Sequence, residues 1–257
     1  MDIRNQRVCI TGASSGIGEA CAKAFAAAGC HLCLMARRKG RLEDLAVTLQ
    51  RHHAVDVITF ELDVRDRDAV SQLAHRLPSP WQHLDILINN AGLSRGLDPI
   101  HRASIDDWEE MIDTNVKGLL YVTHTLLQAM VQQGHGHVIH IGSIAGHEAY
   151  PGGSVYCATK HAVAAINRAM AMDLLGTGVR VSSVDPGMVE TEFSLVRFHG
   201  DEKRAKGVYQ GLQPLSPEDV ADAVLFCATR PAHANVREMV LVPSAQASAV
   251  HSFRTPS

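Results

Sequence analysis

Tyr156 and Lys160 stand four residues apart in the stretch 152-GGSVYCATKHA-162. In a helix, side chains at positions i and i+4 lie on the same face, so the phenol and the ammonium can meet. A nearby positive charge favours the ionised form of a phenol and lowers its pKa from about 10. The spacing therefore allows an acid/base pair, but a surface pair that only covers its own helix has the same spacing and is far more common, so the rest of the chain must decide between them.

A glycine-rich turn, 11-TGASSGIG-18, follows the first strand-like run of the chain. Its glycines allow a tight turn, a close approach to a pyrophosphate and the packing of helix against strand. The start of the next helix offers free N–H groups and the positive end of its dipole to an anion. We therefore predict a phosphate site for a dinucleotide. Its residues are Gly12, Ser14, Ser15, Gly16, Ile17 and Gly18.

The end of the second predicted strand distinguishes the two nicotinamide dinucleotides. Sites for NAD tend to place an acidic residue there, whereas sites for NADP place an arginine near the 2′-phosphate. This chain reads 34-LMARRKGRL-42, with Arg37 and Arg38 and no acid. A guanidinium holds a phosphate through two parallel hydrogen bonds, whereas a carboxylate repels it. NADP is therefore the predicted cofactor.

Short apolar runs of strand length alternate with longer helical patterns along the chain. The predicted strands are 7–11, 30–36, 55–62, 84–89, 137–142, 179–184 and 239–243. The predicted helices are 16–28, 39–52, 66–77, 104–133, 154–175 and 216–229. Ser104 and Ser216 are predicted to cap two of them. This alternation predicts an α/β fold with a single Rossmann-type, doubly wound parallel sheet of about seven strands and helices on both faces.

No linker rich in Pro, Gly or Ser separates these elements, so residues 1–257 are predicted to form one domain. The segment 190–214 differs from the rest because it is polar and charged and carries an aromatic residue every few positions. It follows the sixth predicted strand and therefore lies at the carboxyl edge of the sheet, where open α/β sheets bind ligands. We expect this segment, the lid, to cover the substrate.

Composition excludes several classes of function. The formal net charge of −3 provides no general basic surface for nucleic acid or an anionic membrane. The sequence has no apolar run of membrane-spanning length, and its N-terminus lacks the pattern of a signal peptide. The six cysteines are scattered, and Cys30 and Cys33 should point to opposite faces of one strand. We therefore expect a cytoplasmic protein without disulfides or a metal site.

The motifs together resemble the short-chain dehydrogenase/reductase family along nearly the whole chain. They are 11-TGASSGIG-18, 63-DV-64, 89-NNAG-92, Asn115, 142-GS-143, Tyr156-x-x-x-Lys160 and 186-PG-187. The resemblance implies an NADP-dependent oxidoreductase acting on CH–OH groups. It also implies a tetramer of identical subunits, or a dimer, and the small apolar residues of 154–175 would suit such an interface.

The resemblance assigns a catalytic role to each of four residues. Tyr156 is implied to be the acid/base, and Ser143 to hydrogen-bond the same substrate oxygen. Lys160 is implied to lower the pKa of the phenol and to hold the nicotinamide ribose. Asn115 is implied to support a water that connects Lys160 to solvent. The set is chemically coherent, because hydride transfer leaves negative charge on the oxygen, which needs donors and then a proton.

Further cofactor contacts follow from the same resemblance. Asp63 and Val64 are expected to meet the adenine. The middle of the nucleotide is expected to contact Asn90, Ala91 and Gly92. The nicotinamide is expected to be bordered by Pro186, Gly187, Val189 and Thr191.

Within the family, the second half most resembles the NADP-dependent 3-hydroxy acid (serine/allo-threonine) dehydrogenases. The resembling stretches are 111-MIDTNVKGLLYVT-123, 147-HEAYPGGSVYCATK-160, 191-TEFSLVRFHGD-201 and 231-PAHANVREM-239. This implies a short 3-hydroxy acid, like serine, threonine or 3-hydroxypropionate, and its 3-oxo form. Arg197 of the lid is the candidate for the substrate carboxylate, with Arg95 as an alternative. Glu190 and Glu192 beside it would weaken such a subsite, unless they bind an amino group of the substrate.

Two other functions fit the sequence. One is a broad-specificity, NADPH-dependent reductase of neutral ketones and aldehydes. The other is an NADP-binding sensor that does no chemistry. The presence of Ser143, Tyr156 and Lys160 favours an enzyme, because a pure binding protein needs no acid/base.

Overall fold

The computed structural model describes residues 1–255, which contain one seven-stranded, entirely parallel sheet in the order β3-β2-β1-β4-β5-β6-β7. The strands are β1 (Arg7–Thr11), β2 (His31–Ala36), β3 (Val57–Glu61), β4 (Ile86–Asn89), β5 (Gly136–Ile141), β6 (Val179–Pro186) and β7 (Glu238–Leu241). The predicted Rossmann-type fold is confirmed. Because the chain crosses from β3 back past β1 to β4, a crevice is expected at the carboxyl ends of β1 and β4.

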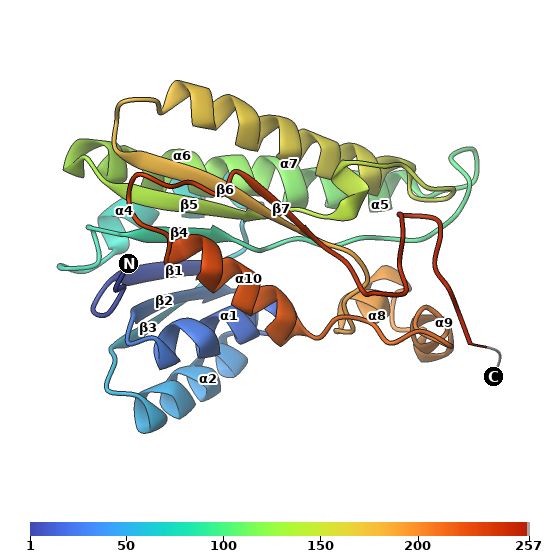
Figure 1. Ribbon diagram of the computed structural model, residues 1–257, viewed down its shortest axis with the longest axis horizontal. Coiled ribbons are helices and arrows are strands. Elements are labelled where there is room, and N and C mark those ends of the chain that lie inside the picture. Colours follow the sequence, from blue (N-terminus) through green and yellow to red (C-terminus); the bar gives the residue numbers. More distant parts are fainter. Residues whose placement is uncertain (256–257) are drawn as a thin grey trace.

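Helices cover both faces of this sheet (Figure 1). One face carries α1 (Gly16–Ala27), α2 (Lys39–His52) and α10 (Pro217–Ala228). The other carries α3 (Arg67–Ser71), α4 (Leu73–Arg76), α6 (Leu119–Gln133) and α7 (Ser154–Asp173). Neighbouring strand residues enter opposite cores: Val8 and Ile10 pack toward α1 and α10, whereas Cys9 packs toward α6. Burial on both faces explains why the strands read as continuous apolar runs.

The two strand cysteines behave as predicted. Cys30 belongs to the core that contains α1, whereas Cys33 belongs to the core on the opposite face of the sheet. All six cysteines are free and buried. Side chains of residues i and i+3 in a strand point apart, so this C-x-x-C cannot close a small redox ring.

The predicted helix 104–133 is interrupted in the structure. Helix α5 (Ile105–Ile112) begins at Ser104, whose hydroxyl accepts a hydrogen bond from the N–H of Asp107. A wider π-helical turn, η1 (Asp113–Gly118), then joins α5 to α6. At its end, a Cβ on Gly118 would lie 2.6 Å from Cγ2 of Val64, so glycine allows this close approach. Turns of this kind often occur at functional sites, and this one carries Asn115.

Two further helices were predicted with small errors in extent. The predicted helix 66–77 forms two short helices, α3 and α4, which are separated at Gln72. Helix α10 begins at Ser216, as predicted, with reciprocal capping between Ser216 and Asp219. No helix in the part of the chain that the structure describes is long and apolar enough to cross a membrane.

The lid contains two short helices, α8 (Phe193–Arg197) and α9 (Glu202–Gly207). Figure 1 shows both beyond the carboxyl ends of the strands. The C-terminal segment 244–255 packs onto the lid, where Arg254 donates to the backbone oxygens of Val208 (3.0 Å) and Gln210 (2.7 Å). Because all seven strands belong to one sheet, we propose that the chain is a single domain with 190–214 as its lid.

Candidate active site

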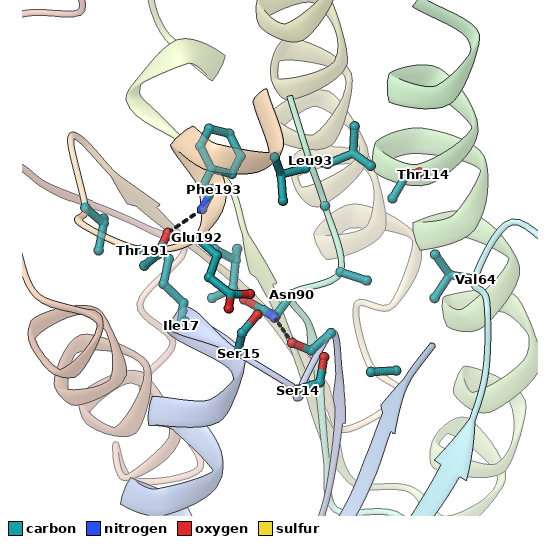
Figure 2. Close-up of a pocket in the computed structure, with 18 of the residues that line it drawn as sticks. Ser14, Ser15, Ile17, Val64, Asn90, Leu93, Thr114, Thr191, Glu192 and Phe193 are labelled. Atoms are coloured by element: carbon teal, nitrogen blue, oxygen red, sulfur yellow. Dashed lines mark hydrogen bonds between the residues drawn. The ribbon is translucent and has the colours of Figure 1, made fainter. Parts of the chain in front are cut away.

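A pocket of about 320 Å³ lies at the carboxyl ends of the central strands, between the glycine-rich turn and the lid (Figure 2). Most of the predicted cofactor and catalytic residues line it. They are Gly12, Ser14, Ser15, Gly16, Ile17, Arg37, Arg38, Asp63, Val64, Asn90, Ala91, Gly92, Ser143, Tyr156, Lys160, Pro186, Gly187, Val189 and Thr191. The topology therefore gathers motifs from the whole chain into one cavity.

The glycine-rich turn has the backbone that a pyrophosphate site needs. Gly12 and Gly16 have φ values of +66° and +55°, which side-chain-bearing residues rarely adopt. A Cβ on Gly12 would also lie 2.8 Å from Nδ2 of Asn90, which donates to the backbone oxygens of Thr11 and Gly12. Gly18, predicted as a cofactor contact, is not among the lining residues. A Cβ there would lie 2.4 Å from the oxygen of Gly12, so it serves close packing behind the turn.

Arg38 stands directly over this turn. Its Nε donates to Oγ of Ser14 at 3.1 Å, and its Nη2 donates to Oγ of Ser15 at 2.5 Å. Its Nη1 donates to Glu192 of the lid at 2.8 Å, and Figure 2 shows Glu192 reaching across the pocket toward Ser15. A guanidinium that already bonds a carboxylate at this position can bond a phosphate there. The turn and its arginine thus fit a dinucleotide with a 2′-phosphate.

The position of Glu192 corrects one expectation from the sequence. Glu192 was expected to weaken a carboxylate subsite at Arg197, but its carboxylate is paired with Arg41 (2.7 Å) and Arg38 (2.8 Å). Hydrogen bonds from Arg41 and Arg38 hold the pKa of Glu192 below its usual value. Its charge is therefore neutralised on the adenosine side of the pocket.

Tyr156, Lys160 and Ser143 meet at the other end of the pocket. Tyr156 and Lys160 lie on consecutive turns of α7 and are both 8% exposed. The Nζ of Lys160 lies 6.0 Å from the centre of the Tyr156 ring and donates to the backbone oxygen of Ile141 at 2.8 Å. Ser143 follows β5, and its Oγ accepts a hydrogen bond from the N–H of Ala145 at 3.1 Å.

Burial dominates the acidity of both titratable groups. It raises the pKa of Tyr156 above its ordinary value, with Tyr150 adding to the rise, while Arg197 and Ser143 oppose it. It lowers the pKa of Lys160 to about 8, against the opposing charge of Asp185. The expected lowering of the phenol pKa by Lys160 is therefore not found among the chain's own side chains, because the ammonium points to a backbone carbonyl. A phenol with a raised pKa is a proton donor.

Asn115 is buried in η1 and does not line the pocket. Its Oδ1 accepts from the N–H of Leu93 at 2.8 Å, and its Nδ2 donates to the oxygen of Leu93 at 2.8 Å. The same Nδ2 donates to Oγ1 of Thr159 at 3.1 Å. These bonds tie the segment after β4 to α7, beside the lysine, so in the structure Asn115 positions elements around the site.

The structure distinguishes between the two candidate arginines for a substrate anion. Nε of Arg95 lies 2.6 Å from Oε2 of Glu110, so its charge is already paired. Arg197, predicted as a substrate contact, is not among the residues that line the pocket, and it has no acidic partner among residues 1–255. Its Nε donates to Oγ of Ser94 at 3.0 Å, and its Nη2 donates to Oη of Tyr150 at 2.8 Å. Its Cζ lies 5.3 Å from the centre of the Tyr156 ring.

Sequence reasoning missed several residues of the site. Ser94 and Tyr150 hold Arg197, but neither was predicted to, although Tyr150 lies in the resembling stretch 147–160. Other residues not predicted to contact a ligand line the pocket: Ala36, Leu62, Leu93, Thr114, Ile141, Gly142, Glu192, Phe193 and Val196. Most of these stand within two positions of a predicted residue, so adjacency to the motifs was the available signal.

A match to the short chain dehydrogenase family covers residues 6–200. This chain belongs to that family. The NADP-dependent 3-hydroxy acid dehydrogenase of Salmonella typhi is 45% identical over 243 residues, which are 94% of this chain and 96% of that protein. Sulfoacetaldehyde reductase 2 of Chromohalobacter salexigens is 45% identical over 241 residues, or 93% and 95% of the two chains.

A solved structure gives the same family assignment. The closed form of serine dehydrogenase complexed with NADP+ is 43% identical to this member of the family, with a TM-score of 0.90. The similarity covers 98% of this chain and 100% of that one. The predicted family and fold are thereby confirmed over nearly the full length.

Proposed function

We propose that this short-chain dehydrogenase interconverts a short 3-hydroxy acid, like serine, threonine or 3-hydroxypropionate, with its 3-oxo form. The protein is an NADP-dependent oxidoreductase that acts on alcohols. This agrees with the family match and with relatives that are named as NADP-dependent or solved with NADP+. The predicted cofactor and the predicted enzyme class are confirmed. Membership of an oxidoreductase family also favours an enzyme over a sensor that does no chemistry.

The observation that carries the substrate proposal is the guanidinium of Arg197 beside Tyr156. It is held by Ser94 and Tyr150, lies against the ring of the proposed acid, and has no acidic partner in residues 1–255. A partly buried cation without a counter-ion favours an anionic ligand, because an ion pair offsets the cost of removing its charge from water. The relatives named for a 3-hydroxy acid and for sulfoacetaldehyde both act on small molecules that carry an acid group.

The proposed mechanism gives each side chain one task. NADPH, when bound, supplies a hydride to the carbonyl carbon. Tyr156 donates its proton to the carbonyl oxygen, and the Ser143 hydroxyl donates a hydrogen bond to the same oxygen. Arg197 pairs with the carboxylate and so fixes the distance of the 3-carbon from Tyr156. Lys160 holds the nicotinamide ribose, and Arg37 and Arg38 hold the 2′-phosphate.

One alternative substrate class has support in the pocket. Leu93, Phe193 and Val196 form an apolar wall that would accept a neutral ketone or aldehyde. A broad carbonyl reductase would use the same Ser143 and Tyr156 but would not need the charge of Arg197. The effect of removing the charge of Arg197 therefore distinguishes a 3-hydroxy acid dehydrogenase from a reductase of neutral carbonyl compounds.

Replacing Arg197 by alanine tests the proposal. Because the ion pair is present in both the ground state and the transition state, its loss should raise KM with little change in kcat. For 3-hydroxy acids we expect KM to rise about 10- to 100-fold, since a hydrogen bond to a charged group contributes roughly 1.5–3 kcal/mol. Neutral alcohols should be nearly unaffected. Steady-state kinetics with matched acidic and neutral substrates measures both.

Arg204→Ala is the matched control, since Arg204 is another lid arginine and packs on Phe198 rather than on the ring of Tyr156. Arg197→Lys should recover part of the affinity for acids. Equal losses for acidic and neutral substrates would show that Arg197 is only structural, and the neutral carbonyl reductase would then be the better proposal.

We also propose a cytoplasmic protein that forms a homotetramer or dimer. All six cysteines are unpaired and buried, in keeping with a reducing compartment. Two large apolar side chains are exposed here, Met172 (71%) on α7 and Leu175 (87%) on the segment that follows it. Light scattering of the purified protein measures the number of subunits, and a monomer at micromolar concentration would contradict the assembly.

A further inference from the structure

Asp185 is a buried carboxylate that the proposed mechanism does not use. It is the second-to-last residue of β6 and is only 2% exposed. Its Oδ2 accepts a hydrogen bond of 2.8 Å from Nε2 of His147, and its Oδ1 accepts one from the hydroxyl of Ser183. Because two donors satisfy it, the carboxylate can remain ionised without contact with water.

This carboxylate is connected to Lys160 through the backbone of Ile141 and Gly142. The ammonium bonds the backbone oxygen of Ile141, and the next residue, Gly142, is pressed against Asp185. A Cβ on Gly142 would lie 1.8 Å from Oδ1 of Asp185, so any side chain at 142 would displace the carboxylate. His147 contacts the carboxylate from the other side. It follows Gly146, where an added Cβ would lie 2.8 Å from the backbone oxygen of Lys160.

The buried ammonium of Lys160 needs a negative charge nearby to remain protonated. It is 8% exposed and has no acidic group within 4 Å among the described residues, so burial strongly disfavours its charged form. Asp185 is the group whose charge opposes this effect and raises the pKa of Lys160. A neutral amine could neither attract ribose hydroxyls as strongly nor stabilise a phenolate.

We propose that Asp185 is a positioning residue, the buried counter-charge that keeps Lys160 protonated, and that His147 and Ser183 hold its carboxylate in place. The inference rests on the proposed function, because Lys160 must act on the cofactor ribose and on Tyr156. It adds a second layer to the site, which runs from Lys160 through Asp185 to His147 near the surface.

Lys160 itself faces His140 of β5 and the phenol of Tyr156, and other charged groups surround His147. All of these must be kept constant in any test. Glu238 of β7 pairs with Arg168 of α7 at 2.6 Å. Arg168 lowers the pKa of Glu238 most, and His147 and Arg237 lower it further. The adjacent Glu148 accepts a hydrogen bond from the N–H of Ala249. Variants should therefore change the charge at 185 or 147 and leave these pairs intact.

The test is the pH dependence of NADPH binding, followed by cofactor fluorescence between pH 6 and 9.5. In Asp185→Asn the ammonium loses its counter-charge, so Lys160 should lose its proton about one pH unit earlier. Binding should match the wild type at pH 6 and weaken at a correspondingly lower pH. The pH profile of kcat/KM for carbonyl reduction should move in the same direction. An unshifted profile would overturn the proposal.

A second pair of variants avoids replacing a buried residue. His147→Lys places a permanent cation against Asp185 and cancels its charge, so the profile should shift as in Asp185→Asn. His147→Gln supplies a neutral donor and should leave the profile in place. A shift of the same size in both would mean that packing, not charge, is responsible, and the proposal would fail.

Matched controls separate this inference from the proposed function. Asp56→Asn alters an exposed aspartate that is also paired with a histidine, His31, far from the pocket, and should shift nothing. If Lys160→Met retains near-native turnover, the proposed function itself fails. If Lys160→Met is inactive while the profiles of Asp185→Asn and His147→Lys stay unshifted, only the role of Asp185 is refuted.

Discussion

The ammonium of Lys160 donates its hydrogen bond to the backbone oxygen of Ile141, 2.8 Å away, while its Nζ lies 6.0 Å from the centre of the Tyr156 ring. Burial of both residues raises the pKa of the phenol and lowers that of the ammonium to about 8. The phenol of Tyr156 therefore stays protonated near neutral pH, as the proposed proton donor in carbonyl reduction must.

Tyr156→Phe should keep the fold and the affinity for NADPH but lose about 10²–10⁴-fold in kcat, the usual contribution of a general acid or base. Only the phenol oxygen is removed. Turnover, NADPH affinity and thermal melting should be measured together. Tyr121→Phe, a partly buried tyrosine of α6 outside the pocket, is the control and should remain fully active. Near-native kcat in Tyr156→Phe would refute the assignment of the acid.

Replacing Arg37 and Arg38 by alanine should weaken NADPH binding much more than NADH binding. Arg38 bonds Ser14 and Ser15 at the glycine-rich turn, where a 2′-phosphate would lie. The preference for NADPH should fall at least about tenfold, because a hydrogen bond to a charged group contributes roughly 1.5–3 kcal/mol. Titration of the variant with each cofactor gives the ratio.

Arg41→Ala is the control for this prediction. Arg41 also bonds Glu192 but does not line the pocket, so its loss should change the cofactor ratio much less. If the double variant at 37 and 38 keeps the wild-type ratio, these arginines contribute only surface charge.

Lys160→Met should abolish activity and yet stabilise the fold at pH 7. The pKa of Lys160 is about 8, against 10.5 for an exposed lysine, so folding disfavours its protonated form. This cost is fully present below pH 8 and is relieved as the pH rises from 8 to 10.5. One pKa unit corresponds to 1.36 kcal/mol, and the lost bond to Ile141 offsets part of the gain, so we expect about 1–3 kcal/mol.

Urea unfolding at pH 7 and at pH 10 checks this prediction, and the advantage of Lys160→Met should shrink at the higher pH. Lys117→Met serves as control, because Lys117 is exposed and paired with Asp113. A less stable Lys160→Met at pH 7 would mean that the favourable contacts of the ammonium outweigh its burial.

Acid should destabilise the fold partly through His140. Burial, with a further contribution from Lys160, lowers its pKa to about 4, against 6.5 for an exposed histidine. Its contribution to stability is therefore complete above pH 6.5 and is lost as the pH falls toward 4. In His140→Gln, the free energy of unfolding should fall less steeply across this range, by up to about 1.4 kcal/mol per pH unit. His83→Gln changes an exposed histidine, and its slope should equal that of the wild type.

Much of the fold was readable from local sequence. The position and length of the apolar runs predicted all seven strands to within about two residues at every end, because strands buried on both faces need continuous apolar residues. Ser104 and Ser216 marked the starts of α5 and α10, because a side-chain oxygen satisfies free N–H groups within the same few residues. The π-helical turn at 113–118 was missed, since it depends on the packing of Gly118 against Val64 rather than on a local pattern.

The sequence by itself determined the glycine-rich turn, the arginines beyond β2 and the spacing of Tyr156 and Lys160, because backbone conformation and helical periodicity are local properties. Only the tertiary structure decided which charged groups are paired and which face the site. It paired Glu192 with Arg38, paired Arg95 with Glu110, left Arg197 facing Tyr156 and placed Asp185 behind Lys160. Charge pairing and desolvation depend on distances between segments far apart in the chain, and these distances exist only once the chain has folded.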